Sequence, residues 1–183
     1  MLDSLFARPL RKADVIDYLQ NARTIRPRAR QPALSLLDGD HEETNLETYH
    51  RSSWAIVRPP YLNAFKYRFA LLQAEHACRL APDRQEYRIG LGAALDRARC
   101  YQEAVETLKR ADRPDQSPSA APAFLAMAHH RLGEREQARA AVSRLREWLK
   151  KTDQAQKEEA RAFLPEVEAI EPDLALLIGS FVP

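Results

Sequence analysis

The stretch LGAALDRARCYQEAVETLKRA, Leu91–Ala111, decides the fold because its pattern returns 34 residues before it and 34 residues after it. An alanine marks the same place in each copy, at Ala70, Ala104 and Ala138. Two antiparallel helices can approach closely only where a side chain is small. Three copies in one register, with no insertion between them, predict a repeated pair of helices.

The matching positions are mostly apolar in all three copies. In the first copy, Val57, Tyr61 and Ala74 stand where the second has Leu91, Leu95 and Leu108, and Trp54 precedes them. We expect the bulky Trp54, Leu91 and Leu125 to fill the space between helices.

This spacing is similar to that of the tetratricopeptide repeat, W-x2-L-G-x2-Y, then A-x3-F, then P. The resemblance covers residues 51–150, with repeats at 51–84, 85–118 and 119–152. It implies an all-α fold in which antiparallel helix pairs stack as a right-handed superhelix, an αα-solenoid.

A narrower resemblance lies in the segments SSWAIVRPP, AEHACRLAPDRQEYRIGLGAAL, YQEAVETLKRADR and FLAMAHHRLGEREQARA. They resemble the repeat region of large planctomycete-type bacterial proteins, where it often follows a serine/threonine kinase or WD40 region. That resemblance implies a scaffold or regulatory tail. The chain has no glycine-rich phosphate loop, HRD or DFG motif of a kinase.

Prolines mark the departures from the pattern. Pro59–Pro60 should end a helix near Arg58, because proline removes a donor and clashes with the preceding turn. Pro122 suits the first residue of a helix, and the polar stretch Asp112–Ala121 is expected to be a loop.

The bulk composition fits one compact folded unit. The chain has 183 residues, 45% hydrophobic and 30% charged, with a formal net charge of only +2. So small an excess argues against a general nucleic-acid binder. Cys78 and Cys100 lack metal-ligand spacing and are expected to be small buried residues. With no leader-like or membrane-spanning apolar stretch, we expect a cytoplasmic protein that does not contact a membrane.

The flanks should add further helices. In residues 1–50 we expect a degenerate helical pair packed on the repeats, with one apolar face made of Val15, Ile16 and Leu19 and another in residues 29–37 made of Ala33, Leu34, Leu36 and Leu37. In residues 153–183 we expect a capping helix, whose apolar face is Ala160, Phe163, Val167 and Ile170, followed by an apolar tail. The tail, Leu174–Val182, either packs back on the repeats or forms a contact with a partner or a second copy.

No constellation of residues predicts chemistry. His129 and His130 are adjacent on a helix and do not converge on one ion, and His129 occupies a core position. The acidic run at residues 38–43 lacks the oxygen spacing of a calcium loop. The arginines Arg23, Arg26, Arg28 and Arg30 could contact phosphate or an acidic partner, but no aromatic residues lie between them to stack bases. We therefore expect no catalytic residue, no cofactor and no metal ion.

The remaining hypothesis is binding of a protein or peptide. In the family that the chain resembles, the first helices of successive repeats line a concave groove. Counting along those helices gives the candidate groove residues Glu86, Ile89, Ala93, Asp96, Arg97, Ala123, Met127, His130 and Arg131. This mixed surface suits an amphipathic helix or an extended segment with an apolar anchor and a charged flank. The alternative is an oligomerisation or regulatory tail of a larger kinase or WD40 signalling protein.

Overall fold

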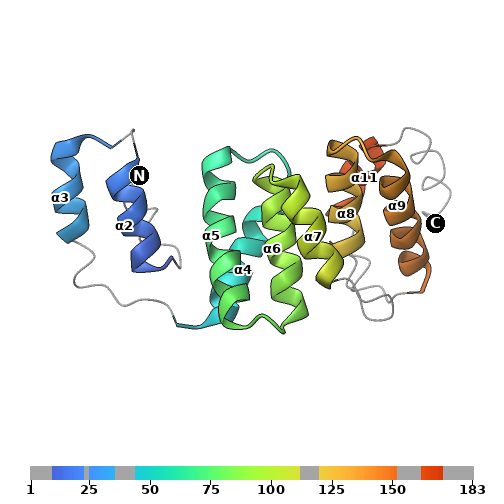
Figure 1. Ribbon diagram of the computed structural model, residues 1–183, viewed down its shortest axis with the longest axis horizontal. Helices are drawn as coiled ribbons and strands as arrows, with labels where there is room; N and C mark the ends of the chain where they lie inside the picture. Colours follow the sequence, from blue (N-terminus) through green and yellow to red (C-terminus); the bar gives the residue numbers. More distant parts are fainter. Residues whose placement is uncertain (1–9, 23–24, 36–43, 112–119, 152–161, 171–183) are drawn as a thin grey trace.

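The protein is all-helical in the parts that the structure describes. The computed structural model describes residues 10–22, 25–35, 44–111, 120–151 and 162–170. Every regular element in these ranges is an α-helix (Figure 1). The helices are α2 (Lys12–Asn21), α3 (Pro27–Ser35), α4 (Leu46–Val57), α5 (Ala64–Leu80), α6 (Gln85–Arg97), α7 (Tyr101–Ala111), α8 (Ala120–Arg131), α9 (Arg135–Lys151) and α11 (Leu164–Ile170). The predicted all-α class is confirmed.

Helices α4 to α9 form three successive pairs. Within each pair, α4 packs on α5, α6 on α7 and α8 on α9. The second helix of one pair also packs on the first helix of the next, α5 on α6 and α7 on α8. The first helices form a further set of contacts, α4 with α6 and α6 with α8. Figure 1 shows the pairs following one another along the longest axis of the molecule.

Small residues permit the close packing inside each pair. Ala70, Ala104 and Ala138 are all buried, as their shared place in the repeated pattern predicts. At Gly92 the approach is closer still, because an added Cβ would lie 2.4 Å from the Cγ of Leu108 on α7. The spacing between α6 and α7 therefore depends on the absence of a side chain at Gly92.

Two connections between helices use the same turn, 34 residues apart. Two residues after its last helical residue, each of α6 and α8 is followed by a residue with positive φ, Arg99 at 69° and Gly133 at 78°. The amides that follow, Cys100 N–H and Glu134 N–H, donate to the carbonyl oxygens of Leu95 and His129 at 2.9 Å. This is the Schellman arrangement, which satisfies carbonyls at the end of a helix and reverses the chain. The short connections expected at Arg99–Cys100 and Gly133–Glu134 are confirmed.

The connection of the first pair differs, as the two prolines predict. Helix α4 ends at Val57 with Arg58 as its C-cap, directly before Pro59. The hydroxyl of Tyr67 donates to the carbonyl oxygen of Pro59 at 3.1 Å and accepts the amide of Leu62 at 3.0 Å. These bonds tie the irregular segment to α5.

Tyr61 does not join the core, although it matches Leu95 in the repeated pattern. Its φ is 65° and its side chain is 92% exposed, whereas Leu95 is buried. The match with Leu95 is in the sequence alone, because Pro59 and Pro60 end the helix and so remove the register on which the alignment depends.

The start of one helix also differs from expectation. Helix α8 begins at Ala120, inside the stretch expected to be a loop, and Pro122 is its third residue rather than its first. A proline is tolerated there because the first four amides of a helix have no partner within it. In the C-terminal segment the described helix is Leu164–Ile170, and residues 152–161 lie outside the described residues.

The two N-terminal helices pack on each other, and α2 packs on α5. Tyr18 of α2 makes edge-to-face contacts with Phe65 and Phe69 of α5, at centroid distances of 5.5 and 5.8 Å. Val15 and Leu19 are buried beside Phe69 in the same cluster. Ile16 is exposed, which corrects its predicted place on the apolar face, since neighbouring residues of a helix point about 100° apart.

The second helix of this N-terminal pair is described only in part. Leu34 of α3 is half-buried against the N-terminal cluster. Leu36 and Leu37 lie outside the described residues, and the side chain of Ala33 is not described.

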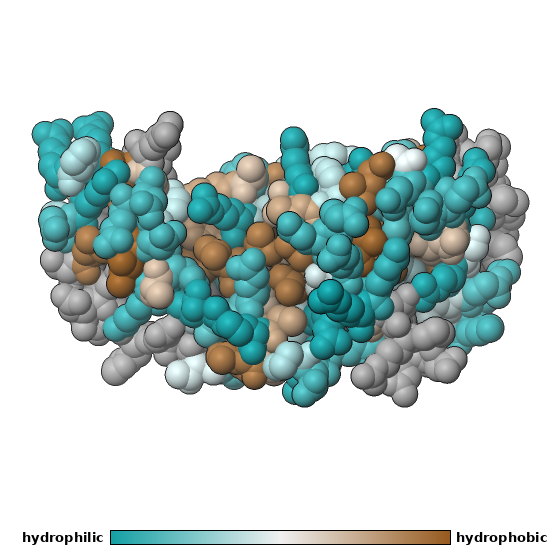
Figure 2. Space-filling model, viewed as in Figure 1, coloured by the Kyte–Doolittle hydropathy of each residue, from teal (hydrophilic) through white to brown (hydrophobic). Residues whose placement is uncertain are grey.

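The main core runs from α4 to α11. Its buried members include Val57, Ala94, Leu108, Phe124 and Val167, which come from helices far apart in the sequence. The face of the molecule seen in Figure 2 is mostly hydrophilic, with apolar patches between charged side chains. In the described part of the chain, no helix combines the length and the apolar character that a membrane crossing requires.

Candidate functional site

The nine candidate groove residues do not form one open surface. Glu86, His130 and Arg131 are exposed. The other six are buried, namely Ile89, Ala93, Asp96, Arg97, Ala123 and Met127. They are covered because α6 and α8 are each surrounded by neighbouring helices, and because α11 lies on this part of the molecule.

Helix α11 and Phe163, the residue before it, together contact the first helices of the three pairs. The helix packs on α8, behind which Figure 1 shows it partly hidden. Phe163, directly before its first residue, is fully buried, with its ring centroid 5.0 Å from Phe124 of α8 and 5.7 Å from Trp54 of α4. Val167, one turn later, is also buried. We call the surface that α4, α6 and α8 present to α11 the inner face.

A buried ion pair joins α11 to the middle helix of the inner face. Nη1 and Nη2 of Arg97 donate to the two carboxylate oxygens of Glu166 at 2.5 and 2.6 Å. The side chains are only 4% and 10% exposed. Such a two-point pair fixes both position and orientation, and it is stronger than a hydrogen bond between neutral groups.

Arg97 is itself held by α4 and α8. Its Nε donates to the carbonyl oxygen of Val57 at 2.9 Å, and its guanidinium carbon lies 5.3 Å from the ring centroid of Phe124. The carbonyl of Val57 is free to accept because the following Pro59–Pro60 stops α4 there. The contacts with α4 and α8 thus orient the guanidinium group toward Glu166.

A second pair, Asp96 with Arg131, adjoins the first. The carboxylate of Asp96 is buried and accepts from Nη1 of Arg131 at 2.5 Å. Its other oxygen, Oδ1, has no hydrogen-bond partner. Burial raises the pKa of Asp96, an effect opposed by the nearby Arg131. Arg131 also lies over the ring of Tyr101, 5.5 Å from its centroid.

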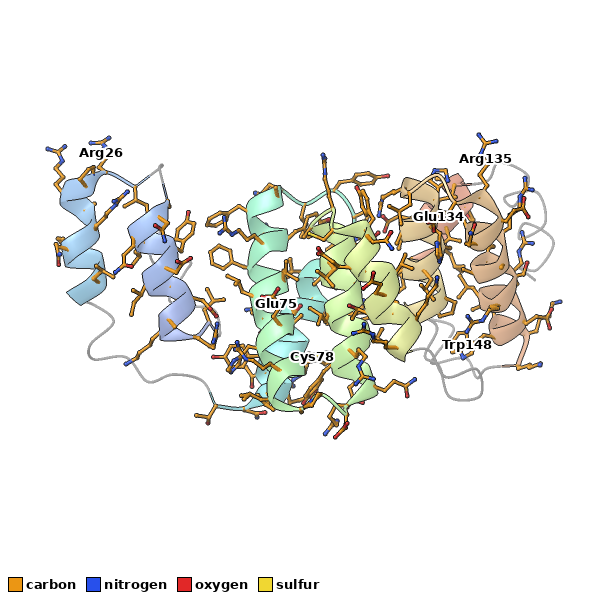
Figure 3. All side chains as sticks on the ribbon, viewed as in Figure 1. Arg26, Glu75, Cys78, Glu134, Arg135 and Trp148 are labelled. Carbon is orange, nitrogen blue, oxygen red and sulfur yellow. The ribbon has the colours of Figure 1, made fainter. Side chains whose placement is uncertain are left out.

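The other residues considered from the sequence lie elsewhere. His129 is buried and pairs with Glu134, in keeping with its predicted core position, whereas His130 is exposed. Among the described residues no three His, Cys, Asp or Glu side chains are grouped as metal ligands. Arg26, directly before α3, and Arg28, on α3, are exposed, and Figure 3 shows Arg26 at one end of the molecule. Arg23, the acidic run at 38–43, Ala160 and the tail Leu174–Val182 lie outside the described residues.

The two cysteines are half-buried rather than fully buried. Cys78 lies on α5, as Figure 3 shows, and Cys100 lies in the connection before α7. Burial raises the pKa of both thiols, which favours the protonated form. A protonated thiol is a poor nucleophile, so neither cysteine has the environment of a reactive residue.

Sequence reasoning found Arg97 but not its partner. The apolar spacing of Phe163 and Val167 predicted a helix with one buried face. It could not indicate which surface covers that face, because Glu166 and Arg97 are 69 residues apart. The sequence feature that could have pointed to this pair is Glu166, an acidic residue between the apolar residues Phe163 and Val167.

Comparison with known proteins gives no indication of what this chain does. No family model, curated protein or solved structure matches the chain.

Proposed function

We propose that the chain is a non-enzymatic protein-interaction module whose inner face binds a helical segment of a partner protein. In this proposal the pairs α4–α5, α6–α7 and α8–α9 are tetratricopeptide-like repeats stacked in a right-handed superhelix. The 34-residue spacing of Ala70, Ala104 and Ala138 supports it. So does the pattern of helix contacts, in which α4, α6 and α8 touch one another in order.

The observation that supports binding is the position of α11. The inner face accepts a short helix through an aromatic anchor, Phe163, an aliphatic anchor, Val167, and an ion pair to Arg97. Recognition of an amphipathic helix by another protein uses the same elements, with anchors at i, i+3, i+4 and i+7. A surface that already fits a helix of the same chain is suited to a helix of a partner.

The test uses the full-length chain with Phe163→Ala and Val167→Ala, which removes both buried anchors of α11. A fluorescent peptide with the sequence of residues 160–171, ARAFLPEVEAIE, is titrated with this variant, and anisotropy is recorded. If the tether gives an effective concentration of about 1 mM and α11 is docked about 99% of the time, the peptide should bind with a Kd of about 10 µM.

Two controls define the outcome. Circular dichroism shows whether the variant remains helical, and a peptide with Phe163→Ala reports binding that does not use the anchor. Saturable binding that the control peptide lacks supports the proposal. A helical variant that binds neither peptide contradicts it.

A further inference from the structure

We infer that the partner presents a short acidic helix with an aromatic residue, a carboxylate three positions later and an aliphatic residue four positions later. It would reach the inner face by displacing α11, which holds the same groups. This inference rests on the proposed function and specifies the ligand of that surface.

The spacing follows from the residues that α11 uses. Phe163, Glu166 and Val167 stand at i, i+3 and i+4, and Ile170 at i+7 is packed against the same core. Residues at these intervals lie on one side of a helix. Pro165 and Ala169 are exposed, so the opposite side of α11 faces solvent.

The requirement for a carboxylate follows from the charges of the inner face. When α11 is docked, two arginines, Arg97 and Arg131, are balanced by Asp96 and Glu166. When α11 leaves, Glu166 leaves with it, and the two arginines face one carboxylate. Arg97 cannot turn easily toward solvent, because its Nε is bonded to the carbonyl oxygen of Val57 and its guanidinium lies over Phe124. A buried cation without a partner is costly, so a ligand that lacks an acid at this position should bind poorly.

Displacement is feasible because α11 is short. It has seven residues, and a helix of that length is marginal in water without tertiary contacts. Within the described ranges, its contacts are the ion pair of Glu166 with Arg97 and the packing of its apolar side chains on the main core. A partner helix with the same groups competes with a tethered ligand of limited intrinsic affinity.

The experiment measures binding of three peptides to two proteins. The peptides are residues 160–171 unchanged, with Glu166→Gln, and with Glu168→Gln as the control that removes the same charge from a position without an ion pair. The proteins are the full-length chain unchanged and the full-length chain with Phe163→Ala and Val167→Ala.

Two results are expected. The unchanged peptide should bind the double variant at least about tenfold more tightly than it binds the unchanged chain, because α11 no longer competes. On the double variant, Glu166→Gln should weaken binding by about tenfold or more, and Glu168→Gln by less than about twofold.

Each contrary result overturns one part of this inference or of the proposed function. Equal affinity for the two proteins means that α11 does not compete. Equal affinity for the Glu166→Gln and unchanged peptides means that the inner face does not select a carboxylate. No binding of any peptide contradicts the proposed function itself.

A second copy of the chain is the other available occupant, and sedimentation distinguishes it. The unchanged chain should remain monomeric as its concentration rises. A dimer that is lost with Phe163→Ala and Val167→Ala would show that α11 is exchanged between copies, and it would overturn the assignment to a partner protein.

Discussion

At the residue scale, the equivalent turns at Arg99 and Gly133 show what the repeated pattern constrains. Both residues have positive φ and both precede the amide that closes the Schellman turn. Glycine adopts this conformation without strain, whereas a residue with a Cβ is penalised by about 1–2 kcal/mol. The second pair therefore contains backbone strain that the third pair avoids.

Glycine at position 99 and alanine at position 133 should reverse this difference in backbone strain. Arg99→Gly should raise the free energy of unfolding by about 1 kcal/mol, and Gly133→Ala should lower it by about 1 kcal/mol. An added Cβ at Gly133 meets no atom within 4 Å, so the second effect is a backbone effect alone. Urea denaturation followed by circular dichroism measures both, and a loss of stability in Arg99→Gly would contradict the assignment.

Gly90 and Gly92 offer a matched pair on α6. A Cβ at Gly92 would overlap the fully buried side chain of Leu108, at 2.4 Å, and should destabilise the fold by about 1–3 kcal/mol. A Cβ at Gly90 meets the ring of His50 at 3.0 Å. That ring packs on Tyr87 and Trp54 and has to move only slightly, so Gly90→Ala should cost less than Gly92→Ala, with part of its cost offset by the higher helix propensity of alanine. Denaturation midpoints for the two variants decide the matter, and equal effects would count against close packing of α6 on α7.

Asp96 predicts a pH dependence whose sign can be checked. Burial raises its pKa from the ordinary 3.8, so the folded state binds this proton more tightly than the unfolded state does. The contribution to stability is complete below 3.8 and is lost as the pH rises through the folded pKa. Relative to Asp96→Asn, the unchanged chain should therefore lose stability as the pH rises. Unfolding of both proteins from acid to neutral pH tests this, and a relative gain would mean that the pair with Arg131 outweighs burial.

At the element scale, the sequence predicts helices better than it predicts their neighbours. The repeated pattern places α6 to α9, and Pro59–Pro60 ends α4 where proline chemistry requires. The place of α11 could not be predicted, because the apolar pattern of a helix does not identify the surface on which the helix packs. Tyr61 shows the converse, since a register derived from one repeat fails where prolines interrupt the helix.

Phe163→Ala should release α11 without unfolding the pairs. A buried Phe→Ala substitution in a core costs about 3–5 kcal/mol, but here the loss is limited to the free energy that docks α11. Amide hydrogen exchange should become fast in Leu164–Ile170 and remain slow in α6 and α7. Uniform acceleration across all helices would show that α11 is an integral part of the fold rather than a docked element.

At the scale of the whole molecule, three similar helix pairs form the surface on which α11, a helix outside the repeated pattern, packs. Three similar pairs place Trp54, Arg97 and Phe124 on successive first helices, so that Phe163 and the short helix that follows it touch all three pairs. The period and the helix class could be predicted from the sequence. The candidate groove residues could not be sorted into buried and exposed ones, because burial of Asp96 and Arg97 depends on packing between distant helices.

Trp54 gives the most direct test of the central claim, that the inner face is a helix-binding surface occupied by α11. The chain has two tryptophans, and the second, Trp148 near the end of α9, is replaced by Phe so that Trp54 alone emits. Adding Phe163→Ala and Val167→Ala should shift the emission of Trp54 to longer wavelength, because its contact with the Phe163 ring is lost. Titration with the peptide of residues 160–171 should then restore the original emission. An emission that does not change on release of α11, or that the peptide does not restore, would contradict the claim.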